Sequence, residues 1–401
     1  MTHTLISFLG KASKVNGGQY RIANYDFDGT IKSSQFFGLA LADTIKPDQL
    51  VILGTSGSMW DVLFETMAEN TQDQHLLALI EAVGSDSVTQ SLLDDCQQAI
   101  SNSLQIQCLL KLIPYGIDQN GQVEILKIMA DGISPESCVS LDLTHGLRHL
   151  PILGLLSAMY LKAARNVQIS GVYYGALDRT IKEITPVMRL EGLLTIADWI
   201  NALNGFDKTG DIAPFSALLI QTGVDHQTAG FLETAAFHES VLNINDARSP
   251  LRNFRTAIAT GLQGIASLFE DSLRERISWI DNQQLYKRQQ NKARFYLKQR
   301  DYVRAAMLGY EAIITYQIQS NNPGAQTEDF DARQEAKKAL EDELRSNKPQ
   351  KWESYKLLRG IRNTLAHTVR PDTQMIQQAL ANENNLNQEL TRVLNDLFVA
   401  V

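Results

Sequence analysis

The stretch Cys138-Val139-Ser140-Leu141-Asp142-Leu143-Thr144-His145-Gly146 decides the fold of the first half of this chain. Its first four residues have the short, apolar character of a buried strand, and a long apolar helix is expected over Pro151–Ala164. Strand, polar loop and helix in this order are typical of an open α/β sheet, where ligands bind beyond the carboxyl ends of the strands. Backbone N–H groups and helix N-termini favour anions there. The loop 142–146 therefore predicts a site for a phosphate-rich ligand, and the chain is predicted to bind a nucleotide.

A second polar loop, Gly54-Thr55-Ser56-Gly57-Ser58, follows the apolar run Gln49–Leu53. It is not a Walker loop, because it lacks the Gly-Lys-Ser/Thr that places a lysine on a terminal phosphate, and the chain has no GxGxxG either. Two polar loops at strand ends in one α/β region predict one shared pocket.

The residues of the second loop have two interpretations. Ser58-Met59-Trp60-Asp61 matches a helix capping box, in which Ser58 and Asp61 satisfy unpaired N–H groups. Thr55, Ser56 and the amides of Gly54 and Gly57 are equally suited to phosphate or ribose, and Trp60 to stacking on a base. For Trp60 taken alone, a buried structural role is the commoner one.

The residues of the first loop, 142–146, also have two interpretations. Asp142 or Thr144 is suited to capping the following helix, and His145 to a loop hydrogen bond. Alternatively, Gly146 lets a ligand approach the backbone, Thr144 and His145 donate to phosphate or hydroxyl oxygens, and Arg148 supplies positive charge.

Composition narrows the class of protein. With 401 residues, 44% hydrophobic and 20% charged, the chain is expected to fold into two or three domains. Its three cysteines lie far apart, with no CxxC or Cys/His cluster, so we expect neither disulfides nor a metal site but a cytoplasmic protein. The longest apolar stretch, Leu150–Leu161, is shorter than the roughly 20 residues of a membrane span, so no membrane anchor is expected.

A formal net charge of −8 argues against indiscriminate nucleic-acid binding, so DNA is not expected and any RNA contact needs a local basic surface. The sequence has two candidates for such a surface. One runs from Lys287 to Arg304 with interleaved aromatic residues, and its competing interpretation is a solvated helix face. The other comprises Lys351, Lys356, Arg359, Arg362 and Arg370.

Strands and helices alternate in the first half, which predicts a mainly parallel sheet with helices on both faces. Residues 11–18 resemble a hairpin connection. The expected strands are Leu5–Leu9, Tyr20–Tyr25, Gln49–Leu53, Ile106–Ile113, Val139–Asp142 and Val167–Tyr174. The expected helices of this half are Phe36–Ile45, Met59–Val83, Asp86–Asn102, Gln122–Ala130 and Pro151–Ala164.

From Pro186 onward the pattern predicts helices alone. We therefore expect an α/β domain over residues 1–187, a helical connector over 188–250 and a helical domain over 251–401. The expected helices are Met188–Leu203, Asp211–Gln221, Thr228–Val241, Asn253–Gln284, Gln289–Arg300, Tyr302–Gln319, Phe330–Ser346, Trp352–His367 and Thr373–Val399.

Three motifs of the first half together resemble the CRISPR-associated DxTHG-motif proteins. They are the loop 142–146 followed by Leu147-Arg148, the start Leu5-Ile6-Ser7-Phe8-Leu9-Gly10, and Leu53 to Trp60. The resemblance implies a Rossmann-like CARF domain that forms a homodimer or higher homo-oligomer. It also implies a cyclic oligoadenylate activator bound across the two-fold axis, with cyclic tetra-adenylate the preferred ring. By that resemblance the ligand-binding residues are Gly10, Gly54, Thr55, Ser56, Gly57, Ser58, Met59, Trp60, Asp142, Thr144, His145, Gly146 and Arg148.

Near the C-terminus, Arg362-Asn363-Thr364-Leu365-Ala366-His367 resembles the Arg-x(4 to 6)-His signature of HEPN ribonucleases. By that resemblance Arg362, Asn363 and His367 are catalytic, and two protomers pair their motifs at one interface. His367 is expected to act as general base or acid, while Arg362 holds the scissile phosphate as a ribose 2′-OH attacks, without a metal. Arg362 and His367 do not share a helix face, because five positions correspond to about 140°.

Together these resemblances imply a cyclic oligoadenylate-activated single-stranded endoribonuclease of type III CRISPR antiviral defence. Two alternatives stay open. One is a ligand-sensing CARF binding module without nuclease activity. The other is a CARF domain that also cleaves its cyclic messenger, with Thr55, Ser56 or His145 aligning a ribose hydroxyl.

Overall fold

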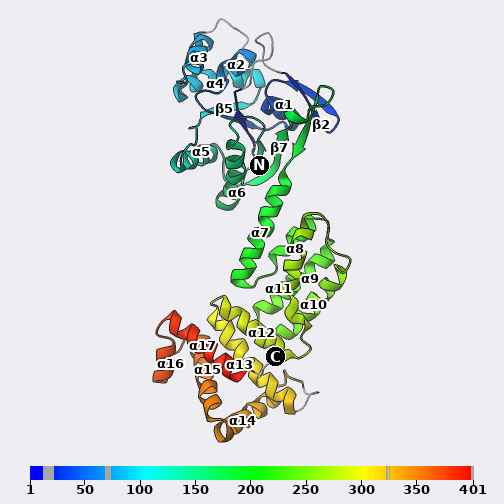
Figure 1. The fold of residues 1–401 in the computed structure, drawn as a ribbon, viewed down its shortest axis with the longest axis vertical. Coiled ribbons are helices and arrows are strands. Elements are labelled where there is room, and N and C mark those ends of the chain that lie inside the picture. The colour runs from blue at the N-terminus through cyan, green and yellow to red at the C-terminus, as the bar shows by residue number, and fades with distance from the viewer. Residues whose placement is uncertain (12–21, 68–73, 322–323, 325, 399–401) are drawn as a thin grey trace. The chain divides into compact units, whose positions relative to one another are not determined.

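The computed structural model describes residues 1–11, 22–67, 74–321, 324 and 326–398. The chain divides into two compact units, Met1–Leu194 and Thr195–Val401, and each is described by itself (Figure 1). The described strands all belong to the first unit, and the second unit is helical. This confirms the predicted order of an α/β fold followed by an all-helical region.

A mixed, mainly parallel sheet forms the centre of the first unit, with strand order β3-β2-β8-β7-β6-β1-β4-β5. The five strands from β7 to β5 in that order are parallel to one another. β8 runs antiparallel to β7, β2 parallel to β8, and β3 antiparallel to β2. The strands are β1 His3–Leu9, β2 Ala23–Phe27, β3 Thr30–Ser34, β4 Gln49–Gly54, β5 Gln107–Leu112, β6 Cys138–Asp142, β7 Gln168–Gly175 and β8 Ile184–Arg189.

Helices cover both faces of this sheet, as predicted. Leu5 and Leu9 of β1 belong to a buried cluster with side chains of α1 to α4, whereas Ile6 and Phe8 belong to a second cluster with α5 and α6. Strands buried on both faces are continuous apolar runs, which is why the central strands were recognisable in the sequence. The helices are α1 Phe37–Ile45, α2 Trp60–Met67, α3 Gln74–Gly84, α4 Gln90–Leu104, α5 Gln119–Asp131 and α6 Leu150–Arg165, with a short 3-10 helix at Leu177–Arg179.

The sequence did not predict β3 and β8. β3 has no buried residue and so lacks the apolar alternation that identifies a strand. β8 contains Pro186, which reads as a strand breaker but is tolerated near the edge of a sheet. The predicted hairpin connection at 11–18 falls almost entirely outside the described residues, and so does part of the helix predicted over Met59–Val83.

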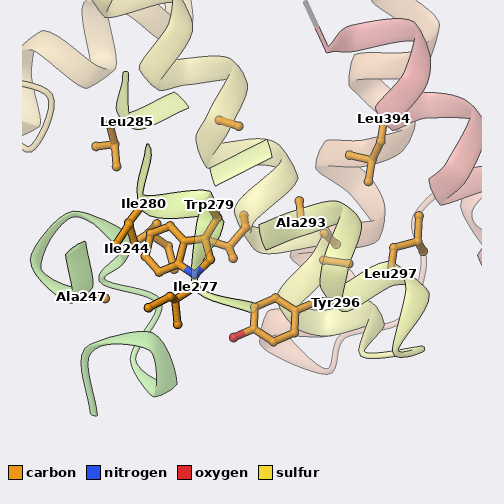
Figure 2. Packing of buried hydrophobic residues seen from close by; sticks show 14 of the residues in the cluster. Ile244, Ala247, Ile277, Trp279, Ile280, Leu285, Ala293, Tyr296, Leu297 and Leu394 are labelled. Carbon is orange, nitrogen blue, oxygen red and sulfur yellow. The ribbon is translucent and has the colours of Figure 1, made fainter. Parts of the chain in front are cut away.

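The second unit packs its helices around a single hydrophobic core that runs from Trp199 to Phe398. Figure 2 shows part of this core, where Trp279 lies among Ile244, Ile277 and Ile280. Its helices are α7 Glu191–Thr209, which begins in the first unit, α8 Pro214–Gln221, α9 His226–Ser240, α10 Ile244–Ala257, α11 Glu270–Arg276, α12 Leu285–Lys298, α13 Tyr302–Asn321, α14 Phe330–Asn347, α15 Pro349–His367, α16 Gln374–Ala379 and α17 Glu383–Leu397, with 3-10 helices at Gly264–Phe269 and Ser278–Asp281. None of the helices in the described ranges is both long and apolar enough to cross a bilayer.

The long helix predicted over Asn253–Gln284 is wrong. α10 ends at Ala257, and the chain then turns through Gly261 and Gly264, which have positive φ angles of 88° and 58°. Residues with a side chain rarely adopt this conformation, so two glycines close together end a helix even where the apolar pattern continues.

The basic stretch that begins at Lys287 is partly internal to the second unit. Arg288 and Lys292 are buried on α12, and Lys292 forms an ion pair with the buried Glu239 of α9. Arg288 donates to the carbonyls of Asn282 and Gln283, at 2.9 and 2.8 Å. Burial lowers the pKa of Arg288 to about 10. Arg294, Lys298 and Arg300 are exposed, so only part of this stretch is a solvated helix face, and its buried members cannot contact RNA.

Candidate functional site

Three strand-end loops of the first unit meet at one edge of the sheet. β6, β1 and β4 are parallel neighbours, so the loops that follow them lie together. A Cβ added to Gly10, after β1, would lie 2.7 Å from the Gly146 amide nitrogen, so a side chain there would separate two of the loops. The Ser58 hydroxyl donates to the Leu9 carbonyl at 2.8 Å and ties in the third loop.

Asp142 anchors the loop 142–146 from inside the protein. Its carboxylate is fully buried and accepts hydrogen bonds from the Ser7 hydroxyl at 2.6 Å and from the Thr144 amide at 2.8 Å. Burial raises the pKa of Asp142, while its hydrogen bonds oppose that rise. The Thr144 hydroxyl in turn accepts from the Gly175 amide at 2.8 Å. Gly146 has a φ of 100°, which only glycine adopts at little cost.

His145 connects this loop to the start of α1. The Phe37 amide donates to Nε2 of His145 at 3.2 Å, so this nitrogen is an acceptor and the imidazole is neutral. Burial lowers the pKa of His145. In this state the second ring nitrogen, Nδ1, carries the proton.

The structure separates the predicted ligand residues into an accessible and a buried group. Gly10, Ser56, Gly57, Thr144 and His145 are half-buried, and Gly146 and Arg148 are exposed. Gly54, Thr55, Ser58, Met59, Trp60 and Asp142 are buried. The buried group can act on a ligand only by holding the loops in place, whereas the accessible group can touch it.

Trp60 requires a correction. Its side chain is only 1% exposed, and Nε1 donates to the Thr55 carbonyl at 2.8 Å. The ring therefore has no free face for stacking on a base and instead supports the second loop. The capping box is also wrong, because the Ser58 hydroxyl accepts from the Thr55 amide and donates to Leu9, and Oδ1 of Asp61 has no hydrogen-bond partner within the described ranges.

Sequence reasoning missed three residues that shape these loops. Ser7 holds Asp142, and its signal was a polar residue inside the apolar strand Leu5–Leu9. Asp86 accepts hydrogen bonds from the Ser56 hydroxyl at 2.5 Å and from the Tyr115 hydroxyl at 2.6 Å, which lowers the pKa of Asp86. Asp86 and Tyr115 had no local signal, because they approach Ser56 only in the folded protein.

The lowered pKa of His145 predicts acid sensitivity of the first unit. Between the folded pKa and 6.5, the unfolded chain binds a proton that the folded chain does not, so the free energy of unfolding falls as the pH decreases. The measurement is the loss of thermal stability between pH 7.5 and 5.5 in wild type and in His145→Asn. We expect a smaller loss in the variant. Burial also lowers the pKa of His3, but His3 is present in both proteins. The difference in stability loss between the two proteins therefore comes from His145. Equal losses would contradict the assignment.

The predicted catalytic residues lie on the last turns of α15. Arg362 is half-buried, lies over the Tyr310 ring at 5.5 Å and donates to Oδ1 of Asn363 at 3.0 Å. Nε of Arg362 is buried without a hydrogen-bond partner in the described chain. Asn363 and His367 are exposed, and His367 is the last residue of the helix. The chain thus brings Arg362 and Asn363 together, while His367 makes no hydrogen bond to either of them among the described residues.

Two adjoining hollows border this motif, with volumes of about 240 and 660 Å³. The first is lined by α13, α14 and α15, and the second by α14, α15, α16 and the segment between the last two helices. Both are lined by Lys337, Arg359 and Asn363, and we call the two together the motif groove. Gly360 allows α16 to approach α15 here, because a Cβ at this position would overlap the Ile376 side chain.

Comparison with known proteins identifies the first unit. The model of the CARF domain of the CRISPR system endoribonuclease Csx1 matches residues 4–178. The N-terminal unit therefore contains a CARF domain, similar to that of Csx1. This confirms the predicted CARF-containing CRISPR-associated protein, and the match includes all three loops that meet at the sheet edge.

Two further similarities extend beyond this domain. The CRISPR-associated protein MJ1674 of Methanocaldococcus jannaschii is 26% identical over an alignment of 244 residues that covers 55% of this chain. The matched part is 38% of that relative's length. Csm6 of Enterococcus italicus, bound to cyclic hexa-2′-fluoro-hexa-dAMP, aligns with 99% of this chain and 95% of its own at 10% identity and a TM-score of 0.37. That score reflects only a loose likeness of the two chains.

Proposed function

We propose that this protein is a cyclic oligoadenylate-activated endoribonuclease of type III CRISPR antiviral defence, acting on single-stranded RNA in the cytoplasm. The observation that supports this proposal most directly is that one chain contains both a CARF domain and a surface Arg362-to-His367 motif bordered by a cationic groove. In this assignment residues 1–187 sense the ligand, 188–250 connect, and 251–401 form a HEPN-like ribonuclease domain. The last two segments share one hydrophobic core.

The chemistry needs no group beyond the side chains of the motif. The ribose 2′-OH attacks the adjacent phosphorus, so a bond from phosphorus to O2′ forms as the bond to O5′ breaks. His367 takes the proton of the 2′-OH or gives one to the leaving oxygen, and Arg362 stabilises the charge on the phosphate oxygens. The products are a 2′,3′-cyclic phosphate and a 5′-hydroxyl.

The decisive assay measures cleavage of a labelled single-stranded RNA with and without cyclic tetra-adenylate, in the presence of a metal chelator. We expect cleavage only with activator, new 2′,3′-cyclic phosphate ends, and no cleavage of the matching DNA, which lacks the 2′-OH. Cyclic hexa-adenylate in parallel identifies the ring size. If the protein binds the ligand but cleaves no RNA, it is a ligand-sensing module and the nuclease assignment is wrong. Intact cyclic ligand after incubation excludes messenger cleavage by the CARF domain.

The ligand site is proposed to lie across a homodimer. α6 begins just after the loop 142–146 and exposes Ile152, Leu156 and Tyr160, with 63%, 48% and 47% of their surface accessible. These positions are four residues apart, so they form one apolar stripe on the helix. Pairing two such stripes around a two-fold axis buries them and brings together the ligand loops of two protomers.

Activation requires the ligand to bind the cleaving arrangement of the dimer more tightly than the resting one. A ligand with equal affinity for both arrangements shifts neither population. The ligand-binding residues that we propose to contact the ring are the accessible ones, Gly10, Ser56, Gly57, Thr144, His145, Gly146 and Arg148.

The stripe on α6 predicts the effect of Leu156→Asp. A carboxylate at the centre of the stripe must be desolvated for the dimer to form, so we expect monomers in analytical ultracentrifugation. Affinity for cyclic oligoadenylate should fall at least about tenfold, which corresponds to about 1.4 kcal/mol. The matched control is Leu77→Asp on α3, an equally apolar, 66% exposed residue on the other face of the sheet. A variant that stays dimeric would place the interface elsewhere.

A further inference from the structure

The motif groove contains cations that form no ion pair with the residues that the structure describes. Three of its cations are paired with carboxylates: Arg333 with Glu311, Arg359 with Glu341, and Lys356 with Glu353. By contrast, Lys337, Arg362 and Arg370 form no ion pair with any residue in the described ranges. Against them the lining offers one carboxylate outside these pairs, that of Asp372.

Lys337 holds a particular position among these cations. It lies on α14, which is separated in sequence from the motif, yet it lines both hollows together with Asn363. It is half-buried, so its stem packs against the groove wall, and an ammonium on such a stem is free to move toward an anion. In a chain with a net charge of −8, such a site attracts a polyanion locally and not over the whole surface.

We propose that the motif groove binds the backbone of single-stranded RNA, and that Lys337 contacts a phosphate flanking the scissile one. This inference rests on the ribonuclease function proposed above, because Arg362 and Asn363 line the same groove. Lys337 is a positioning residue here: it holds the strand, while the motif acts on the reacting phosphate. The contact carries no base preference, since phosphates are the same at every nucleotide.

The test uses the full chain and a 2′-O-methyl RNA 20-mer, which lacks the attacking hydroxyl and so measures binding alone. We expect Lys337→Gln to weaken binding about three- to tenfold, and the slope of log affinity against log salt to decrease in magnitude by about 0.7, the contribution of one phosphate contact on a single strand. With cleavable RNA and activator, KM should rise while kcat changes little.

The matched control is Lys338→Gln, which removes the same charge from the next residue of α14. Lys338 is exposed and lies outside the lining of both hollows, so its binding curve and salt slope should match those of wild type. The inference would be overturned if the two substitutions weakened RNA binding equally, or if Lys337→Gln bound RNA as tightly as wild type. It would also be overturned if the wild-type protein bound no RNA. If Lys337→Gln weakens RNA binding but the wild-type protein cleaves no RNA, the groove is an RNA-binding site and the proposed ribonuclease function is wrong.

Discussion

His367→Ala is expected to abolish activated RNA cleavage while cyclic oligoadenylate binding stays at the wild-type level. His367 is exposed at the end of α15, so its removal leaves no buried gap and should not unfold the helical unit. A general acid or base contributes about 10²- to 10⁴-fold to a rate, and we expect a loss in that range. The measurements are single-turnover cleavage of labelled RNA and calorimetric titration of the ligand.

The control for this variant is His226→Ala, which removes another exposed histidine of the same unit, from the first turn of α9. It should cleave RNA at the wild-type rate. Retained cleavage by His367→Ala would remove the HEPN assignment, because no other histidine belongs to the motif. A loss of ligand binding in His367→Ala would show that the variant disturbs the whole chain instead of the chemistry.

Glu239→Ala is expected to destabilise the helical unit by about 3–5 kcal/mol, because it leaves the ammonium of Lys292 buried without a counterion. Both partners are almost completely enclosed, with 5% and 3% of their side-chain surface accessible. Lys292 also lies 4.9 Å from the Phe295 ring centre and 5.0 Å from that of Tyr296, and these rings hold the ammonium only weakly in place of the carboxylate. Urea unfolding followed by circular dichroism measures the change.

Two further variants distinguish the effect of the Glu239–Lys292 ion pair from that of the surrounding packing. Glu233→Ala removes an exposed carboxylate from the same helix and should change stability by less than about 0.5 kcal/mol. The double variant Glu239→Leu/Lys292→Met replaces the pair by apolar side chains and should regain most of the lost stability. If the double variant is as unstable as Glu239→Ala, the loss comes from packing and not from the unpaired charge.

Much of the fold was predictable because its signals are local. The central strands are apolar runs, since both of their faces are buried, and the helices packed on them follow an apolar period. In the helical unit the same period misled at Asn253–Gln284, where the chain turns through Gly261 and Gly264. β3 and β8 were missed for the same reason: β3 has a single apolar residue, Ile31, and β8 contains Pro186, so neither has a clear local signal of a strand.

The candidate sites were only partly predictable. The loops at 54–58 and 142–146 could be found from glycine and hydroxyl residues at strand ends. Their division into accessible and buried members could not, because the enclosure of Trp60 and Asp142 depends on the elements packed around them. The same holds for the basic stretch on α12, since the partner that neutralises Lys292 is Glu239, 53 residues earlier in the chain.

By itself, the sequence determined that this chain joins an α/β fold with polar strand-end loops to a helical region with an Arg362-to-His367 motif, because strand runs, helix periods and strand-end loops are short-range patterns. Only the tertiary structure decided that Ser7 holds Asp142 across 135 residues, that Lys292 is interior, and that Lys337 borders the motif. These are contacts between distant segments. Burial, charge neutralisation and access to a ligand depend on such contacts, and no short stretch of sequence contains them.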